Sequence, residues 1–257
     1  MINGMTTRCL PWAAAVVLAA GCKFGQVPVQ NEPSPDSLYD GALLQQNVRR
    51  VAEVLDDRLS RGQISGGQKD EILHAYIRDQ VADIDRALIP ADQVWRFADV
   101  YRQMEDWEAT FDLYTIAVMN AESEDRRVND SLRLAEATAR LGDIEEGINL
   151  VRSTFDVDPL GKAPILMATL YEFAPAVQGR GHDHELAVLL EEAAGQHLLT
   201  VVDPQSDAGR RFIKARRHHV REAWFAVIRL YRIEQDEEGM RGAIRRSEKM
   251  LRRFASA

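Results

Sequence analysis

Cysteine is almost absent from this chain. Its 257 residues include two cysteines, Cys9 and Cys22, and both lie near the N-terminus. The remaining residues therefore offer no thiol for a disulfide or a cysteine-based metal site, so a domain there depends on packing alone. Aromatic residues make up only 7% of the chain, while Leu, Ala, Arg and Glu are abundant, which favours helix over sheet. No run of about 18 apolar residues follows Cys22, so we expect this part to be soluble.

Sequence motifs of the common enzyme classes are also absent. There is no G-x-x-x-x-G-K-[ST] phosphate loop, no G-x-G-x-x-G after a strand and no G-x-S-x-G nucleophile elbow. Adjacent acids such as Glu145-Glu146 diverge on a helix and do not share a site for general acid–base work. We therefore predict a protein without catalytic residues or a cofactor.

The histidines leave one alternative open. A long connection is predicted over residues 175–183, and His182, Asp183, His184 and Glu185 follow one another at its end. Two imidazoles and two carboxylates are ligands that Zn²⁺ accepts, so an envelope metal-binding protein or enzyme built on this connection is the alternative hypothesis. However, the two histidines flank a predicted helix start, and no fixed-spacing pair such as H-E-x-x-H is present. We favour no metal site.

The first residues resemble a bacterial lipoprotein signal. Arg8 is followed by an apolar run, 11–20, which is too short to span a bilayer comfortably. The run ends in Leu-Ala-Ala-Gly-Cys at 18–22, which is similar to a lipobox. This resemblance implies a signal peptide over 1–21, with Met1 or Met5 as its start, and a lipid on Cys22. An ordinary cleaved signal peptide or an N-terminal membrane anchor is the alternative.

The residue after Cys22 helps to place the protein in the cell envelope. In bacterial lipoproteins an aspartate at this position resembles an inner-membrane retention signal, and this chain has Lys23 instead. We therefore expect attachment to the outer membrane, facing the periplasm. Residues 22–36 hold three of the nine prolines and no helical period, which is typical of a flexible tether.

Residues 37–257 show helical periodicity throughout, and in the middle of the chain the pattern repeats. Two helix–turn–helix patterns follow each other 37 residues apart. The first set is Val94, Phe97, Ala98, Tyr101, Trp107, Thr110, Tyr114 and Ala117, and the second is Ser131, Leu134, Ala135, Thr138, Ile144, Gly147, Val151 and Thr154. This spacing resembles a degenerate tetratricopeptide repeat (TPR), whose period is about 34 residues. The resemblance implies an all-α fold, an α-solenoid of antiparallel helix pairs, over about 37–90, 91–122, 125–158, 160–200 and 206–255.

Most aromatic residues recur at helical spacing and are predicted to lie between helices: Phe97, Tyr101, Trp107, Tyr114, Tyr171, Trp224 and Tyr231. Trp95 falls one position off that inward face, in line with Asp99 and Arg102 on the same helix. In tetratricopeptide domains the first helix of each pair lines a concave groove, so the resemblance implies that these residues contact a partner. The equivalent positions in later units are Glu136, Thr169, Glu172, Arg229 and Arg232.

Charge is distributed unevenly. Residues 22–207 contain 17 Lys and Arg against 34 Asp and Glu, whereas residues 208–257 contain 14 against 6. The basic end is either a solvated cap or a surface for anionic lipid, an acidic partner or the acidic body of a second copy. We expect no nucleic-acid partner, because an exported protein does not meet DNA or RNA.

Together these features predict a lipid-anchored scaffold or adaptor of the bacterial envelope that binds another protein or peptide without catalysis. Its plan is similar to that of the helical-repeat lipoproteins that serve outer-membrane protein assembly and pilus secretin assembly. Specificity would come from polar side chains on the groove, and rigidity from the stacked apolar helices.

Overall fold

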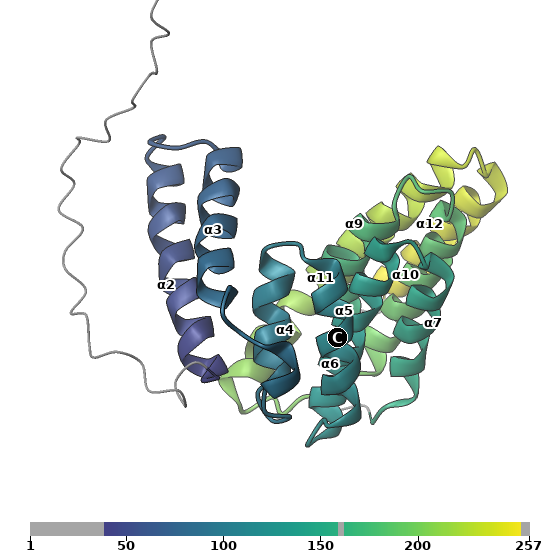
Figure 1. Cartoon of the computed structure of the whole chain (residues 1–257). Helices are drawn as coiled ribbons and strands as arrows, with labels where there is room; N and C mark the ends of the chain where they lie inside the picture. The colour runs from purple at the N-terminus through teal and green to yellow at the C-terminus, as the bar shows by residue number, and fades with distance from the viewer. Residues whose placement is uncertain (1–38, 159–161, 253–257) are drawn as a thin grey trace, which may run out of the picture.

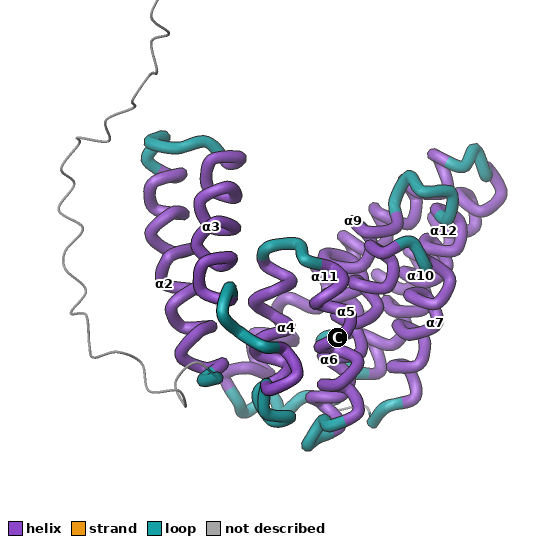
Figure 2. The backbone as a smooth tube through the Cα atoms, in the orientation of Figure 1, coloured by secondary structure: helices purple, strands orange, loops and turns teal. Residues whose placement is uncertain are grey.

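The structure is a computed structural model, and it describes residues 39–158 and 162–252. Within these ranges every regular element is a helix and no strand occurs, as Figure 2 shows. The predicted all-α class is therefore confirmed for the described part of the chain. The expected signal peptide, the lipid attachment at Cys22 and the tether over 22–36 all lie outside the described residues.

The elements follow one another with short connections. In chain order they are α2 (Gly41–Ser60), α3 (Gly66–Val81), η1 (Arg86–Leu88), α4 (Val94–Gln103), α5 (Trp107–Met119), α6 (Glu124–Leu141), α7 (Ile144–Ser153), η2 (Thr154–Asp156), α8 (Ile165–Ala168), η3 (Thr169–Phe173), α9 (Ala174–Val177), α10 (Asp183–Leu199), α11 (Asp207–Ile233) and α12 (Glu237–Arg252). Residues 206–233 contain no proline and a single glycine, Gly209, near the start, so the sequence predicts one long helix there, and α11 covers this stretch.

Local signals set where these helices begin and end. Ser65 accepts a hydrogen bond from the backbone N–H of Gln68, whose side chain accepts from Ser65 in return, a capping box at the start of α3. The carboxylates of Asp106 and Asp143 cap α5 and α7 by accepting hydrogen bonds from the backbone N–H groups of Ala109 and Glu146. Gly142 ends α6 with φ at 114°, a left-handed conformation that favours glycine.

Helices that are consecutive in the chain pack against each other. The closest pairs are α4 with α5, α5 with α6, α6 with α7, α10 with α11 and α11 with α12, and α2 also packs on α4. Figure 1 shows α2 and α3 at one side of the molecule and α10 and α12 at the other. One hydrophobic core joins α2–α5, reaching Leu134 of α6, and a second joins α6–α12. Leu150 packs against both cores and so links them.

The helix over 165–177 differs from the prediction. Its centre, η3, is a π-helix, and Pro175 lies inside the last turn. Proline has no N–H to donate and its ring crowds the preceding turn, and a π-turn relieves such strain. As a result the helix continues to Val177, and the connection to α10 is shorter than the predicted loop over residues 175–183.

The same helix buries a different face from the one predicted. Its fully buried residues are Ile165, Leu166, Thr169, Phe173, Ala176 and Val177. Tyr171, predicted to lie between helices, is 53% exposed, and Thr169, predicted to contact a partner, has no exposed surface. The Thr169 hydroxyl donates to the backbone oxygen of Ile165. Tyr171 is thus exposed where the pattern predicted burial, and Thr169 is buried where it predicted exposure.

Candidate functional site

Six side chains from α4, α5, α6 and η3 are joined by ion pairs and one tyrosine hydrogen bond, and we call them the ion-pair network: Asp99, Arg102, Tyr114, Arg133, Glu136 and Glu172. Asp99 of α4 lies at its start. One carboxylate oxygen of Asp99 accepts from the Tyr114 hydroxyl at 2.5 Å and lies 3.0 Å from the Arg133 guanidinium. The other oxygen accepts from the side-chain amide of Gln45 at 3.0 Å. Asp99 is therefore held by three different helices.

Arg102, one helical turn further along α4, continues this network. Its guanidinium lies 2.9 Å from the carboxylate of Glu136 on α6 and 3.6 Å from that of Glu172 on η3. The structure thus brings together four of the residues that the sequence predicted to contact a partner: Asp99, Arg102, Glu136 and Glu172.

Burial perturbs the groups of the ion-pair network. Burial and the nearby Asp99 carboxylate raise the pKa of Tyr114 well above its usual value, so its hydroxyl remains a donor. Burial also raises the pKa of Glu136, although Arg102 opposes this effect. Burial disfavours the charged form of Arg102, but the carboxylates of Glu172 and Glu136 outweigh this effect. The pKa of Arg102 is therefore raised. Paired charges of this kind contribute more to fixing one arrangement of helices than to net stability.

An open pocket of about 250 Å³ borders the network. It is lined by residues of α6 and of the α8–η3 helix, among them Arg133, Glu172 and Tyr171. Two charged side chains of the network thus meet an exposed aromatic ring at one hollow of the surface. Aromatic and Arg side chains are the types that most often dominate the energy of protein–protein contacts.

Trp95 lies at a second pocket, of about 310 Å³, between the start of α4, the end of α5 and the start of α6. The guanidinium carbons of Arg126 and Arg96 lie 3.2 Å and 4.2 Å from the centre of its ring. These distances are cation–π contacts. Trp95 is half-buried by them and does not join the ion-pair network.

Arg229 and Arg232 are exposed on α11. In the described part of the chain neither is recorded in an ion pair, and Arg232 lines a separate pocket with Tyr231 and Met240. The structure therefore does not bring these two predicted residues to the ion-pair network.

Sequence reasoning missed two members of the network. Tyr114 was assigned only to the core, and its hydroxyl was not considered. Arg133 lies 34 residues after Asp99, the usual length of a tetratricopeptide repeat. The two predicted patterns are 37 residues apart and align Asp99 with Glu136, so this alignment misses Arg133.

The predicted metal candidates do not converge. The Nδ1 atom of His184 lies 3.7 Å from Asp236, and its ring contacts Tyr231 edge-on with 5.5 Å between centroids. Asp183 turns inward and accepts hydrogen bonds from the Gly179 backbone at 2.9 and 3.1 Å, whereas His182 is only partly buried at the start of α10. Across residues 39–158 and 162–252, no group of three or more His, Cys, Asp or Glu side chains is placed to hold a metal ion.

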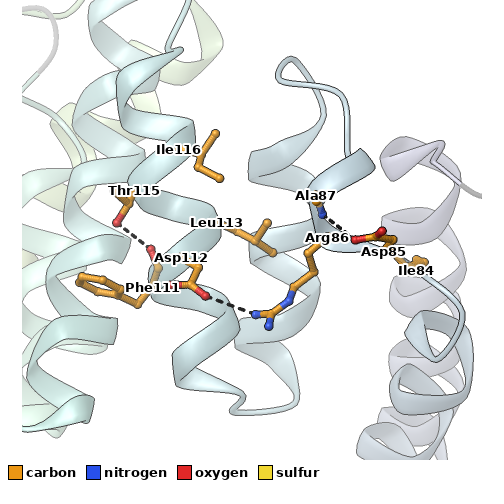
Figure 3. A pocket seen from close by; sticks show the side chains of 9 residues that line it. All are labelled: Ile84, Asp85, Arg86, Ala87, Phe111, Asp112, Leu113, Thr115 and Ile116. Carbon is orange, nitrogen blue, oxygen red and sulfur yellow. Dashed lines mark hydrogen bonds and ion pairs between the residues drawn. The ribbon is translucent and has the colours of Figure 1, made fainter.

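Figure 3 shows a third pocket, of about 670 Å³, between the η1 segment and α5. Arg86 and Asp112 lie 3.5 Å apart across it, and Leu113 and Ile116 form much of its wall. None of the predicted contact residues lines this pocket, and it offers one exposed ion pair beside apolar side chains. We assign it no role.

No protein-family model matches the sequence, and no curated protein matches it. None of the helices within the described residues combines the length and the apolar character needed to cross a bilayer.

Proposed function

We propose that this chain is a non-catalytic scaffold of the bacterial cell envelope that binds another polypeptide along the ion-pair network. One observation carries the proposal. Arg102, Glu136 and Glu172 lie on the first helices of three successive predicted units, and Arg102 contacts both acids. Contacts between the first helices of successive units support a regular stack of helical units.

A regular stack of this kind is an α-solenoid of degenerate tetratricopeptide-like helix pairs. The pairing of α4 with α5 and of α6 with α7 supports it, because each unit of a solenoid contacts mainly its neighbours. Gly147 contributes to the packing of α7 on α6: an added Cβ would lie 3.0 Å from the backbone oxygen of Ala135 and from the ring of Phe173. Such close approach is typical of paired helices with a small residue at their contact.

The partner binds where the ion-pair network meets solvent. Tyr171 is exposed beside Arg133 and Glu172 in the 250 Å³ pocket, so an incoming peptide finds an aromatic surface and charges of both signs. The charges are already held in position by their neighbours in the network, which lowers the ordering cost of binding.

The proposal includes the lipid anchor. Acyl chains on Cys22 would hold the protein at the membrane, since each buried CH₂ contributes about 0.8 kcal/mol, and residues 22–36 would tether the domain to it. Replacing Cys22 with Ala should release the protein from the membrane fraction into the soluble periplasmic fraction. Continued tight association of the Cys22→Ala chain with membranes would show that the anchor lies elsewhere.

Site-specific photo-crosslinking tests the binding surface. A benzoylphenylalanine at position 171 should yield a reproducible protein adduct in the native envelope, which mass spectrometry then identifies. Phe225 is a matched control, because it is an aromatic residue of similar exposure, 59%, on α11 and outside the ion-pair network. Equal adduct patterns from positions 171 and 225, or lipid adducts alone, would refute the scaffold proposal.

Self-association through the basic end remains a separate part of the proposal. α11 exposes Arg229 and Arg232, which suit the acidic body of a second copy because opposite charges attract most strongly at low salt. Sedimentation should then show oligomers that dissociate as salt is raised, and a monomer at every salt concentration would exclude this contact.

A further inference from the structure

Four unpaired polar atoms lie around the pocket that contains Trp95, which we call the amide pocket. Gln93, Arg96, Arg126 and Asp130 all line it. Each has one buried side-chain atom without a hydrogen-bond partner in the described structure: Oε1 of Gln93, Nε of Arg96, Nη2 of Arg126 and Oδ1 of Asp130. Leaving a buried polar atom unpaired is unfavourable, so their concentration at one pocket calls for a physical reason.

The other polar atoms of these side chains are used to hold them in position. Nε of Arg126 donates to Oδ2 of Asp130 at 3.1 Å. The Arg96 guanidinium donates to Gln45 at 3.3 Å, and the Gln93 amide nitrogen donates to Asp92 at 2.8 Å. Each side chain is therefore fixed through one atom while another, buried atom is left unpaired.

The unpaired atoms define the chemistry of that ligand. Gln93 and Asp130 offer two acceptors, and Arg96 and Arg126 offer two donors. A carboxylate would satisfy the arginines but would meet Asp130, which is only 1% exposed, with a like charge. An ammonium group would satisfy Asp130 but would face two guanidinium groups. Only a neutral group that carries both a donor and an acceptor matches all four.

We propose that the amide pocket binds an amide group of a polypeptide, with Asp130 and Gln93 accepting from its N–H and Arg96 and Arg126 donating to its oxygen. The pocket volume of about 310 Å³ is at the lower end of ligand sites and suits one or two peptide units. Trp95 lines the pocket beside the two arginines that contact its ring. The four atoms lose their contacts with water when the chain folds. Hydrogen bonds to a ligand therefore require no further desolvation of these atoms.

This inference rests on the proposed function for the source of the amide, a polypeptide partner, but its test uses small probes. N-acetylglycine N-methylamide carries backbone amides, and propionamide carries the amide of an Asn or Gln side chain. Acetate and methylammonium are charged probes of similar size. The side-chain N–H signal of Trp95, assigned in the NMR spectrum by its loss in Trp95→Phe, reports on binding to the full chain.

One or both amide probes should shift the Trp95 signal saturably, and the charged probes should not. The probe that shifts it distinguishes backbone from side-chain recognition. Asp130→Ala should weaken the amide probe at least tenfold. If Asp130→Ala does not fold, Gln93→Leu removes an acceptor at the helix boundary and should weaken the probe at least threefold. Arg127→Ala, which changes an exposed neighbour paired with Glu124, should bind as the unchanged chain does.

Two results would overturn the inference. If no probe shifts the signal, water alone satisfies the four atoms and the pocket is structural. If acetate or methylammonium binds as well as the amides, the site selects charge and not amide chemistry. Either failure leaves the crosslinking at position 171 unaffected, so it is distinguishable from a failure of the scaffold proposal.

Discussion

His197 makes the stability of the fold depend on acidity. It lies on α10 with no exposed surface, and its ring centroid is 4.7 Å from that of Phe212 and 5.7 Å from that of His219, both on α11. Neither ring nitrogen has a hydrogen-bond partner in the described structure. Burial, together with His219 and Arg216, lowers the pKa of His197 from 6.5 to about 4.

The sign and size of the effect follow from this pKa. Between pH 6.5 and about 4 the unfolded chain binds a proton at His197 and the folded chain does not, so stability falls as the pH falls through this window. One pKa unit corresponds to 1.36 kcal/mol, so the full loss is about 3 kcal/mol. Most of it, about 2 kcal/mol, occurs between pH 7 and pH 5. The pKa of His219 is also lowered by burial and acts in the same direction.

Replacing His197 with Leu isolates this contribution. Leucine is similar in size and cannot take a proton, and it removes two buried nitrogens that lack partners, so His197→Leu should be about 1 kcal/mol more stable at pH 7. Other groups oppose the acid effect, because burial raises the pKa of Asp130 and Glu136. Comparing His197→Leu with the unchanged chain cancels them.

Urea unfolding followed by circular dichroism at pH 7, 6 and 5 measures the difference. The gap in unfolding free energy between His197→Leu and the unchanged chain should widen by about 2 kcal/mol from pH 7 to pH 5. Lys214→Leu, a change at an exposed cation on α11, serves as a control whose gap should stay constant. A gap for His197→Leu that is constant within about 0.5 kcal/mol would refute the reasoning.

Three further changes test the packing by urea unfolding. Gly147→Ala places a Cβ 3.0 Å from Phe173 and should cost about 1–3 kcal/mol; an unchanged midpoint would mean that α7 shifts without strain. Tyr114→Phe removes the donor to Asp99 and should cost about 1 kcal/mol, and a stabilised variant would contradict the account of the network. Ser65→Ala removes the capping box of α3 and should cost about 1 kcal/mol; no loss would show that this cap is dispensable.

The sequence pattern predicted those features that depend on neighbouring residues. Apolar periodicity, together with the absence of proline from 206–233, predicted the long helix that the structure shows as α11. The interval between similar units also selected Asp99, Arg102, Glu136 and Glu172 without coordinates, because a repeated interval places equivalent positions side by side. The prediction that these residues contact a partner stays a prediction.

The pattern was wrong where the helix departs from regular geometry. The π-turn of η3 and Pro175 change the face that the 165–177 helix buries, so Thr169 and Tyr171 were assigned to the wrong sides. The sequence pattern also could not predict features that depend on tertiary contacts. The amide pocket joins Gln93 to Asp130, 37 residues apart, and only the folded chain shows which of their atoms remain unpaired.

The amide pocket and the ion-pair network both include residues of α6, and these residues lie in consecutive stretches of that helix. Arg126 and Asp130 on α6 serve the pocket, and Arg133 and Glu136 serve the network. The charges interact, since Arg133 opposes the raised pKa of Asp130. Ten residues of helix span about 15 Å, which equals about five residues of an extended peptide.

A single partner segment can therefore contact both sites. If it does, Asp130→Ala should reduce crosslinking from position 171 severalfold although residue 171 is unchanged, and Arg127→Ala should not. Crosslinking of unchanged yield in Asp130→Ala, with the amide probe lost, would mean that the two surfaces bind independently.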